Sequence, residues 1–351
     1  MVSIIGHDAL RVLFYGSDKF SLVSLRALLS LQLPLTVVTK HCCPVYEVAH
    51  NAGLTIKLWP FTVPKGDFDL GVVVSFGHLI PAASICACRY GMVNVHPSLL
   101  PRWRGPAPLV HTILANDERT GVSLITVAKN KFDTGAIIKQ RLLKESPRNL
   151  EYRDLERLTA TMGADMLTEF ISDVDGALAK AYAQSDEGAT KAPKIKASMA
   201  ELDWQQSLLQ VDCQRRAIAN FEPLTTWFEK HKLRLSLLPL RQRPPDPDVS
   251  YDTMKVKKMR NDVSKSVPSS SGILCPGYVY YHKKRRLIAV LCRDGWVWVD
   301  FVCVAGKKKM TAQDFYAGFL NKSTCKVFTR EPITLAEHSK SKTCTRQINE
   351  A

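Results

Sequence analysis

Asn94 and His96 are the residues in this sequence whose types and spacing are best suited to chemistry. They stand two positions apart in the stretch GMVNVHPS. Alternate side chains of a β-strand point to the same face, so the amide and the imidazole would lie side by side. Gly105 and several prolines make the following loop stiff and closely packed. These prolines are Pro97, Pro101, Pro106 and Pro108. Two polar side chains that lead into a rigid loop predict a reaction site, with a purely structural histidine as the alternative.

Asp133 is a third candidate, in the stretch KFDTG that follows an apolar run. An Asp-x-Gly sequence in a loop usually forms a turn, and by itself it predicts nothing more. An amide, an imidazole and a carboxylate at neighbouring strand ends can, however, form one acyl-transfer site. Taken together with Asn94 and His96, Asp133 therefore predicts a shared site.

The segments around these residues alternate between apolar runs and helical patterns. Strands are predicted at 11–15, 35–38, 69–77, 91–98 and from 121 onward. This alternation is typical of an α/β domain with a doubly wound, mainly parallel sheet and helices on both faces. Ligands bind at the carboxyl ends of the strands in such a sheet, and Asn94 and His96 fall at one of these ends. A long helical pattern at 151–182 closes the domain.

A second domain is predicted beyond a linker. Residues 183–205 contain Gly188, Pro193 and three lysines, a composition typical of a linker. A short helix at 206–220 is followed by strands at 232–238, 277–281, 287–292 and 296–304, and such short strands predict a small, OB-like β-barrel. The predicted divisions are an N-terminal extension (1–10), a catalytic domain (11–182), the linker (183–205), a basic C-terminal domain (206–321) with a flexible insertion at 243–272, and a tail (322–351).

Positive charge is concentrated in the second half of the chain. The formal net charge is +15; residues 206–351 hold 26 Lys and Arg against 13 Asp and Glu, whereas residues 1–205 hold 22 against 20. This imbalance predicts chemistry in the first domain and contact with a polyanion in the second, with a merely solvated basic surface as the alternative. No apolar run approaches the roughly 20 residues that span a bilayer. We therefore expect no membrane contact, and we expect a monomer.

The ten cysteines do not form a metal-binding pattern. No C-x-x-C pair occurs, so a zinc site has little support and we expect no metal. The cysteines are predicted to be free thiols that act as small apolar side chains in a reducing compartment. The turn after the first strand, Gly16-Ser17-Asp18, lacks G-x-G-x-x-G, which argues against a dinucleotide-dependent enzyme.

Several stretches of the chain resemble one enzyme family. NVHPSLLPRWRGPAP resembles the signature loop of the folate-dependent formyltransferases, and FDTG resembles the aspartate site of the same family. FYGSDKFS and VVVSFGHLIP are similar to its first and third strand segments. ATKAPKIKASMAELDW resembles the linker of the methionyl-tRNA formyltransferase branch, and GYVYYHKKRRLIAVLCRDGWVWVDFV is similar to the C-terminal domain of its mitochondrial members. The similarity covers about 11–320.

This resemblance implies a Rossmann-like fold and an activity. The formyl group of 10-formyltetrahydrofolate would pass to the amino group of methionine on initiator Met-tRNA, giving formylmethionyl-tRNA for translation initiation. Asn94 and His96 would donate hydrogen bonds to the oxyanion of the tetrahedral intermediate, each worth about 3 kcal/mol. Asp133 would orient His96 and help to remove the amine proton.

Binding residues are predicted in two groups. The resemblance assigns folate contacts to Ser98, Leu99, Leu100 and Pro101, and to Val74, Ser75, Phe76 and Gly77. Contacts with tRNA are predicted for Arg102 and Arg104 beside the site and for basic clusters of the second domain, because such clusters bind phosphates. These clusters are Lys283, Lys284, Arg285 and Arg286, and Lys307, Lys308 and Lys309.

Localisation in the mitochondrial matrix is implied by the resemblance alone. The opening MVSIIGHDAL carries an aspartate and no arginine, which is unlike an Arg-rich transit peptide. Many bacterial members carry a basic insertion after the second strand, whereas here VVTKHCCPVYEVAHNAGL passes almost directly from strand to helix. How initiator tRNA is discriminated therefore stays open. Two other functions are alternatives: a formyltransferase for a small amine, and a non-catalytic RNA-binding relative.

Overall fold

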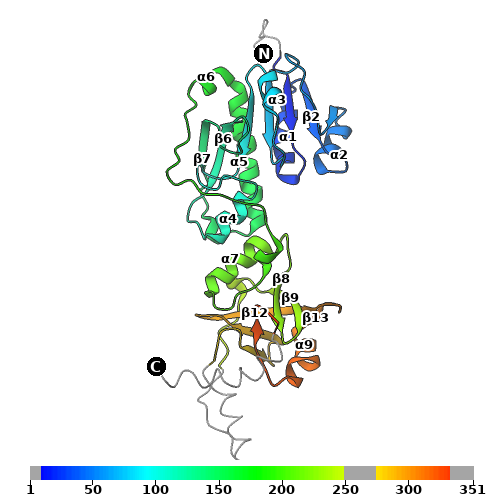
Figure 1. The fold of residues 1–351 in the computed structure, drawn as a ribbon, viewed down its shortest axis with the longest axis vertical. Helices are drawn as coiled ribbons and strands as arrows, with labels where there is room; N and C mark the ends of the chain where they lie inside the picture. Colours follow the sequence, from blue (N-terminus) through cyan, green and yellow to red (C-terminus); the bar gives the residue numbers. More distant parts are fainter. Residues whose placement is uncertain (1–8, 249–273, 333–351) are drawn as a thin grey trace, which may run out of the picture. The chain divides into compact units, whose positions relative to one another are not determined.

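The computed structural model describes residues 9–248 and 274–332, and the chain divides into two compact units. Unit 1 is Met1–Ile195 and unit 2 is Lys196–Ala351. Figure 1 shows unit 1 in blue to green and most of unit 2 in yellow-green to orange. The division falls inside the segment predicted as a linker. Most of the predicted N-terminal extension, insertion and tail lies outside the described residues.

Unit 1 is built on a seven-stranded sheet with the order β3-β2-β1-β4-β5-β6-β7. The strands are β1 (Val12–Tyr15), β2 (Leu35–Thr39), β3 (Thr55–Leu58), β4 (Leu70–Val74), β5 (Met92–His96), β6 (Gly121–Thr126) and β7 (Ile137–Leu142). The first five are parallel, and β6 and β7 run antiparallel to their neighbours. The predicted doubly wound, mainly parallel sheet is confirmed. The edge strands β3 and β7 were not among the predicted strands.

Helices cover both faces of this sheet (Figure 1). They are α1 (Lys19–Ser30), α2 (Pro44–Asn51), α3 (Ala82–Ala87), α4 (Pro108–Leu114), α5 (Tyr152–Ser172) and α6 (Val174–Ala179), with a 3₁₀ turn η1 at Pro147–Asn149. The single helix predicted at 151–182 is in fact two. Asp173 breaks it with non-helical backbone angles, and its side chain accepts a hydrogen bond from the Gly176 amide to begin α6.

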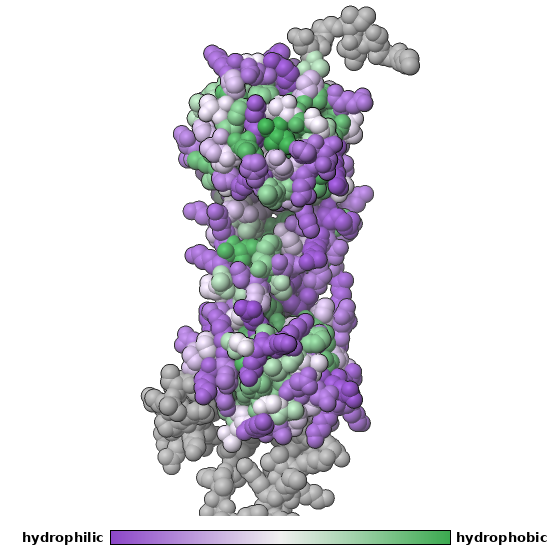
Figure 2. All heavy atoms as spheres, turned by 90° about the vertical axis from the view of Figure 1, so that its right-hand side faces the viewer, coloured by the Kyte–Doolittle hydropathy of each residue, from purple (hydrophilic) through white to green (hydrophobic). Residues whose placement is uncertain are grey.

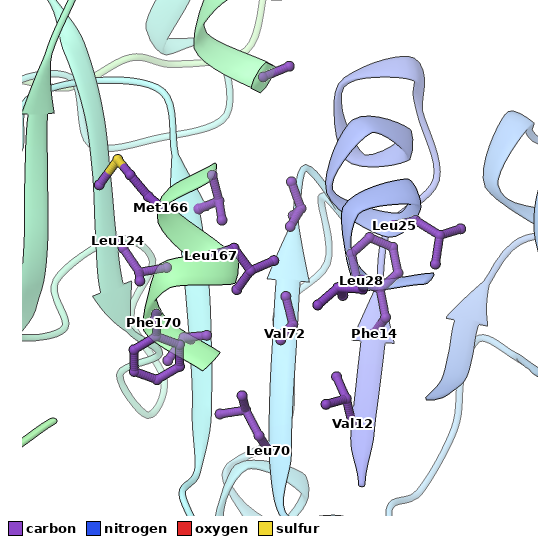
Figure 3. Packing of buried hydrophobic residues seen from close by; sticks show 14 of the residues in the cluster. Val12, Phe14, Leu25, Leu28, Leu70, Val72, Leu124, Met166, Leu167 and Phe170 are labelled. Carbon is purple, nitrogen blue, oxygen red and sulfur yellow. The ribbon is translucent and has the colours of Figure 1, made fainter. Parts of the chain in front are cut away.

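The core of unit 1 lies on both faces of the sheet because neighbouring residues of each central strand point to opposite sides. On β1, Phe14 belongs to the cluster under α1 and α5, whereas Tyr15 belongs to the cluster on the other face. Figure 3 shows the first cluster, in which Leu28 of α1 and Leu167 of α5 lie over the strands. Burial on both sides explains why β1 and β4 are continuous apolar runs, and it holds their carboxyl ends rigidly.

Unit 2 contains an antiparallel sheet with the order β10-β11-β12-β9-β8-β14, to which β13 is added beside β12. Its strands are β8 (Leu224–Phe228), β9 (His231–Leu237), β10 (Val279–His282), β11 (Leu287–Leu291), β12 (Trp296–Val304), β13 (Met310–Thr311) and β14 (Phe328–Thr329). Its helices are α7 (Leu208–Ile218) and α9 (Ala312–Gly318), with 3₁₀ turns η2 (Ala197–Ala200), η3 (Leu240–Gln242) and η4 (Leu320–Lys322). A bridge between Tyr278 and Val327 joins the two edges. The predicted small barrel is confirmed.

Ordered structure in unit 2 extends beyond residue 321, where the tail was predicted to begin. Phe328 is 1% exposed, and its ring lies 5.9 Å from that of Phe228 and 6.2 Å from that of Phe315. A strand of two residues is too short to produce a recognisable alternating pattern, so the sequence did not indicate it.

Within residues 9–248 and 274–332, no helix is both long and apolar enough to cross a membrane. Figure 2 shows hydrophilic side chains interspersed with smaller hydrophobic patches on one face of the molecule.

Candidate active site

The structure brings Asn94, His96 and Asp133 together at the carboxyl end of β5. Asn94 Nδ2 donates a hydrogen bond to Asp133 Oδ1 over 3.1 Å. His96 Nδ1 lies 3.5 Å from the same oxygen, and its side chain is 5% exposed. Asn94 and His96 share a face of β5, and Asp133 comes from the loop between β6 and β7. One carboxylate oxygen is thus shared by the amide and the imidazole.

The loop after β5 completes this cluster. The Gly105 amide donates to Asp133 Oδ2 over 2.9 Å, and His96 Nε2 lies 3.0 Å from the Trp103 carbonyl oxygen. A carbonyl can only accept, so Nε2 carries a hydrogen. A substrate oxygen that takes this hydrogen must therefore displace the Trp103 carbonyl. The second N–H of Asn94, in contrast, has no acceptor among the described residues and is available to a substrate.

Glycines are required on both loops because the backbones approach so closely. A Cβ on Gly105, at φ +134°, would lie 2.5 Å from the Ala192 carbonyl oxygen. A Cβ on Gly135 would overlap the Thr126 carbonyl. Asp133 itself has φ 55°, a left-handed conformation that Asp tolerates better than most residues do. The carboxylate is therefore presented by a tight, left-handed turn.

Residue Gln184, which the sequence pattern did not single out, holds this turn from the other side. Its Nε2 donates to the carbonyls of Asp133 (2.9 Å) and Gly135 (2.8 Å). No sequence signal marked it, because it lies 51 positions after Asp133 in a segment whose composition is that of a linker.

The predicted folate contacts after β5 are mostly interior. Ser98 is 1% exposed and its hydroxyl donates to the Arg102 carbonyl over 2.7 Å. Leu100 is 3% exposed and packs with Ile125 and Ile137. Leu99 and Pro101 are half-buried. The side chains of Ser98 and Leu100 thus stabilise the loop.

The predicted contacts after β4 form a distinct bend. Val74 and Phe76 are buried, whereas Ser75 and Gly77 are exposed and have left-handed backbones. The Ser75 hydroxyl donates to the Asp18 carboxylate. In the part of the chain that the structure describes, the amides of Phe76 and Gly77 have no acceptor.

An aromatic cluster supports this bend. The Phe76 ring lies 5.3 Å from Tyr15, 5.2 Å from Trp59 and 5.2 Å from His78. His78 Nε2 is buried without a partner among the described residues. Burial, followed by the positive charges of two lysines, lowers the pKa of His78, which favours the neutral ring. These lysines are Lys40 and Lys194.

Arg102 and Arg104, which were predicted as tRNA contacts, have hydrogen-bond partners within unit 1. Arg102 forms two bonds with Asp117, over 2.8 and 2.6 Å, and this hydrogen bonding raises the pKa of the Arg102 guanidinium. Arg104 donates to Gln184 Oε1 and Asp186 Oδ1, each over 3.0 Å. Both guanidinium groups therefore fasten the loop after β5 to its surroundings.

The outer face of the barrel in unit 2 carries cations beside aromatic rings. Lys232 pairs across the sheet with Trp227, and Arg234 lies between Thr225 and Cys303. Leu233, between the two cations, is buried, so both cations point outward. Neither forms an ion pair with a carboxylate of the described ranges.

The predicted basic clusters flank this face or lie in turns. Lys309 Nζ is 4.0 Å from the centre of the Phe301 ring, and Lys307 borders a hollow of about 420 Å³ that Lys232 and Arg234 also line. The cluster 283–286 is exposed in the turn between β10 and β11. We call the five residues Trp227, Lys232, Arg234, Lys307 and Lys309 the basic face.

In the described ranges, no group of three or more His, Cys, Asp and Glu side chains is arranged to hold a metal ion.

Comparisons with known proteins agree with this architecture. The formyl transferase family model matches residues 62–171, and the model of the formyl transferase C-terminal domain matches residues 194–320. The chain is 35% identical to the mitochondrial methionyl-tRNA formyltransferase of Homo sapiens over 89% of this chain and 78% of the relative. It is 32% identical to the methionyl-tRNA formyltransferase of Coxiella burnetii over 65% of this chain and 78% of the relative.

A solved structure supports the fold. The N-formyltransferase from Helicobacter canadensis, solved in complex with folinic acid and dTDP-3-aminofucose, superposes with a TM-score of 0.55 at 14% identity and covers 83% of this chain and 98% of its own.

Proposed function

Since the chain belongs to the methionyl-tRNA formyltransferases of the formyl transferase family, we propose that Asn94, His96 and Asp133 catalyse its reaction, the transfer of a formyl group to the amino group of methionine on initiator Met-tRNA. This assignment rests on the Oδ1 atom of Asp133, which lies 3.1 Å from Nδ2 of Asn94 and 3.5 Å from Nδ1 of His96. The formyl donor in this proposal is 10-formyltetrahydrofolate.

Each residue has a role that follows from its contacts. Attack of the amine on the formyl carbon produces an oxyanion, and the second N–H of Asn94 donates to it. A preorganised donor of this kind is worth about 3 kcal/mol. His96 adds its Nε2 hydrogen once the substrate oxygen replaces the Trp103 carbonyl. Asp133 keeps the imidazole oriented and accepts the proton that the attacking amine loses, directly or through a water. The bond between the formyl carbon and N10 of the folate then breaks, and tetrahydrofolate leaves with a proton on N10.

The folate fits the bend after β4 by its chemistry. The pyrimidine ring of a reduced pterin is flat and carries hydrogen-bonding groups along its edge. The amides of Phe76 and Gly77 and the buried Nε2 of His78 are unpartnered within the described ranges, and the rings around Phe76 make the bend rigid. Folinic acid in the Helicobacter canadensis enzyme is a related ligand on the same fold. The half-buried side chains of Leu99 and Pro101, on the loop after β5, also contact the folate in this proposal.

The tRNA is bound in this proposal by the basic face and by the cluster 283–286. Exposed cations next to aromatic rings suit phosphates and unstacked bases. Arg102 and Arg104, also predicted as tRNA contacts, hold the loop after β5 through their partners in unit 1. The mitochondrial names of the Homo sapiens and Bos taurus relatives support a matrix location, and the monomeric state stays a prediction.

The test is formyl transfer by the purified full chain, with 10-formyltetrahydrofolate and three acceptors in parallel: initiator Met-tRNA, glycinamide ribonucleotide and a nucleotide-linked amino sugar. We expect formylation of Met-tRNA alone. Comparable rates with a small amine would support the alternative of a small-amine formyltransferase, and inactivity toward all three would favour the non-catalytic alternative. Uncharged tRNA is the control for binding without reaction.

A further inference from the structure

A segment from Tyr182 to Pro193, which we call the strap, fastens both loops of the active site. At its beginning, the Ile137 amide donates to the Tyr182 carbonyl over 2.7 Å, which ties the strap to β7. Near its end, the Arg104 amide donates to the Thr190 carbonyl over 2.9 Å. This part of the predicted linker is thus a structural part of unit 1.

Gln184 of the strap joins the two loops through a single side chain. Its two Nε2 hydrogens go to the carbonyls of Asp133 and Gly135, over 2.9 and 2.8 Å. Its Oε1 accepts from Nε of Arg104 over 3.0 Å, and Arg104 directly follows Trp103, whose carbonyl contacts His96. Both hydrogens and the oxygen of the amide are therefore used, and each bond ends on a loop of the site.

These bonds hold the backbone of Asp133, whereas its other partners contact only its carboxylate. Gly105, Asn94 and His96 contact the carboxylate, whereas Gln184 holds the backbone carbonyl of a residue with φ 55°. Without Gln184, two half-buried carbonyls lose a donor and the left-handed turn is free to relax. A carboxylate that moves by about 1 Å can reduce turnover roughly 100-fold.

We propose that Gln184 is a positioning residue that sets the geometry of Asp133 against His96 from its place in the strap. This inference rests on the catalytic role proposed for Asp133. Gln184 contacts no reacting group itself, and its effect is transmitted through the backbone of the turn.

Gln184→Glu is the sharpest variant, because it changes the chemistry at nearly constant shape. The new carboxylate can still accept from Arg104, but it has no hydrogens for the two carbonyls and repels them. We expect kcat to fall by a factor of about 10 to 100, with KM for Met-tRNA changed less than about twofold. Asp186→Asn is the matched control: Asp186 also contacts Arg104, is 94% exposed and does not contact the turn. We expect it to keep wild-type kcat.

A double-mutant cycle separates positioning from a general structural effect. If Gln184 acts through Asp133, Gln184→Glu causes little further loss in an Asp133→Asn background. A residue that only stabilises the fold would reduce kcat by the same factor again, and that result would overturn the proposal. Gln184→Met, which is uncharged and of similar length, repeats the test should Gln184→Glu lower the melting temperature.

Hydrogen exchange at the Gly105 amide tests the same geometry without using activity. This amide donates to Asp133 Oδ2, so displacement of the carboxylate exposes it. We expect exchange at Gly105 to be at least about tenfold faster in Gln184→Glu and unchanged in Asp186→Asn, since exchange reports local opening. Wild-type exchange together with wild-type kcat in Gln184→Glu would refute the positioning role. Failure of the wild-type chain to formylate Met-tRNA would instead refute the proposed function.

Discussion

The polar groups of unit 1 and the cations of unit 2 are arranged in opposite ways. Around Asp133, both carboxylate oxygens and the backbone carbonyl have hydrogen-bond partners within 3.1 Å. On the basic face, Lys232 and Arg234 are exposed and form no ion pair with the described carboxylates. Groups that stabilise a developing charge must be held in place beforehand, whereas phosphate contacts act by charge and tolerate motion.

Arg102 and Arg104 show why charge alone does not identify a binding residue. Both are cations beside the site, yet each is held by partners of its own unit. A cation already paired with a carboxylate adds little attraction for a phosphate, because the pair is nearly neutral. The difference between the units predicts large, specific effects of substitution in unit 1 and small, additive effects in unit 2.

Substitution of a catalytic residue is the largest expected effect. Asn94→Ala, His96→Ala and Asp133→Ala should each reduce kcat for Met-tRNA formylation about 10²- to 10³-fold, the loss typical of one preorganised group. Melting temperature and folate affinity, measured by calorimetry, should change little. His50→Ala removes an exposed histidine of α2 and serves as the control. Near-normal turnover in any of the three would contradict the role assigned to that residue.

Removal of one cation from the basic face should have a moderate effect. Lys232→Ala and Arg234→Ala should raise KM for Met-tRNA a few-fold and leave kcat unchanged. Each should reduce the slope of log affinity against log salt concentration by about 0.7 to 0.9. Titration of tRNA at several salt concentrations measures this, with Lys57→Ala, on the exposed strand β3 of unit 1, as the control. An unchanged slope in both variants would remove the basic face from the tRNA contacts.

The smallest expected effect is a pH dependence of stability in unit 1. Burial, followed by repulsion from Asp18, raises the pKa of Glu156 on α5 above its usual 4.5, against the opposing hydrogen bond from Tyr152. The folded state therefore holds this proton more tightly than the unfolded state does, and stability falls as pH rises from about 4.5 through the folded pKa. Glu156→Gln should remove this fall in melting temperature.

Glu169 provides the matched control because its shift has the opposite sign. Hydrogen bonds from Lys139 and then Arg141 lower the pKa of Glu169 below 4.5. Its stabilisation is present above the unfolded pKa and is lost as pH falls through the folded pKa, so Glu169→Gln should lower stability at neutral pH and not in strong acid. If the two substitutions changed the pH dependence of stability in the same direction, this would contradict the burial assigned to Glu156.

The central strands were predictable because their burial on both faces requires continuous apolar runs. The strands β3, β7, β8, β13 and β14 were not, because they lie at or near an edge and are not buried along their whole length, so they form no continuous apolar run. The same contrast holds in the site. Asn94 and His96 are recognisable from their alternation on one strand, whereas Gln184 lies in a segment whose composition indicates a linker.

By itself, the sequence determined which chemical groups the chain has and which belong to one strand face, because alternation is a local property of the backbone. It also determined the family, through the loop after β5 and the segment around Asp133. The tertiary structure decided which of those groups are held and which are free. Pairing of Asp117 with Arg102 and bridging by Gln184 depend on residues brought together by folding, and local sequence does not encode distances across the fold.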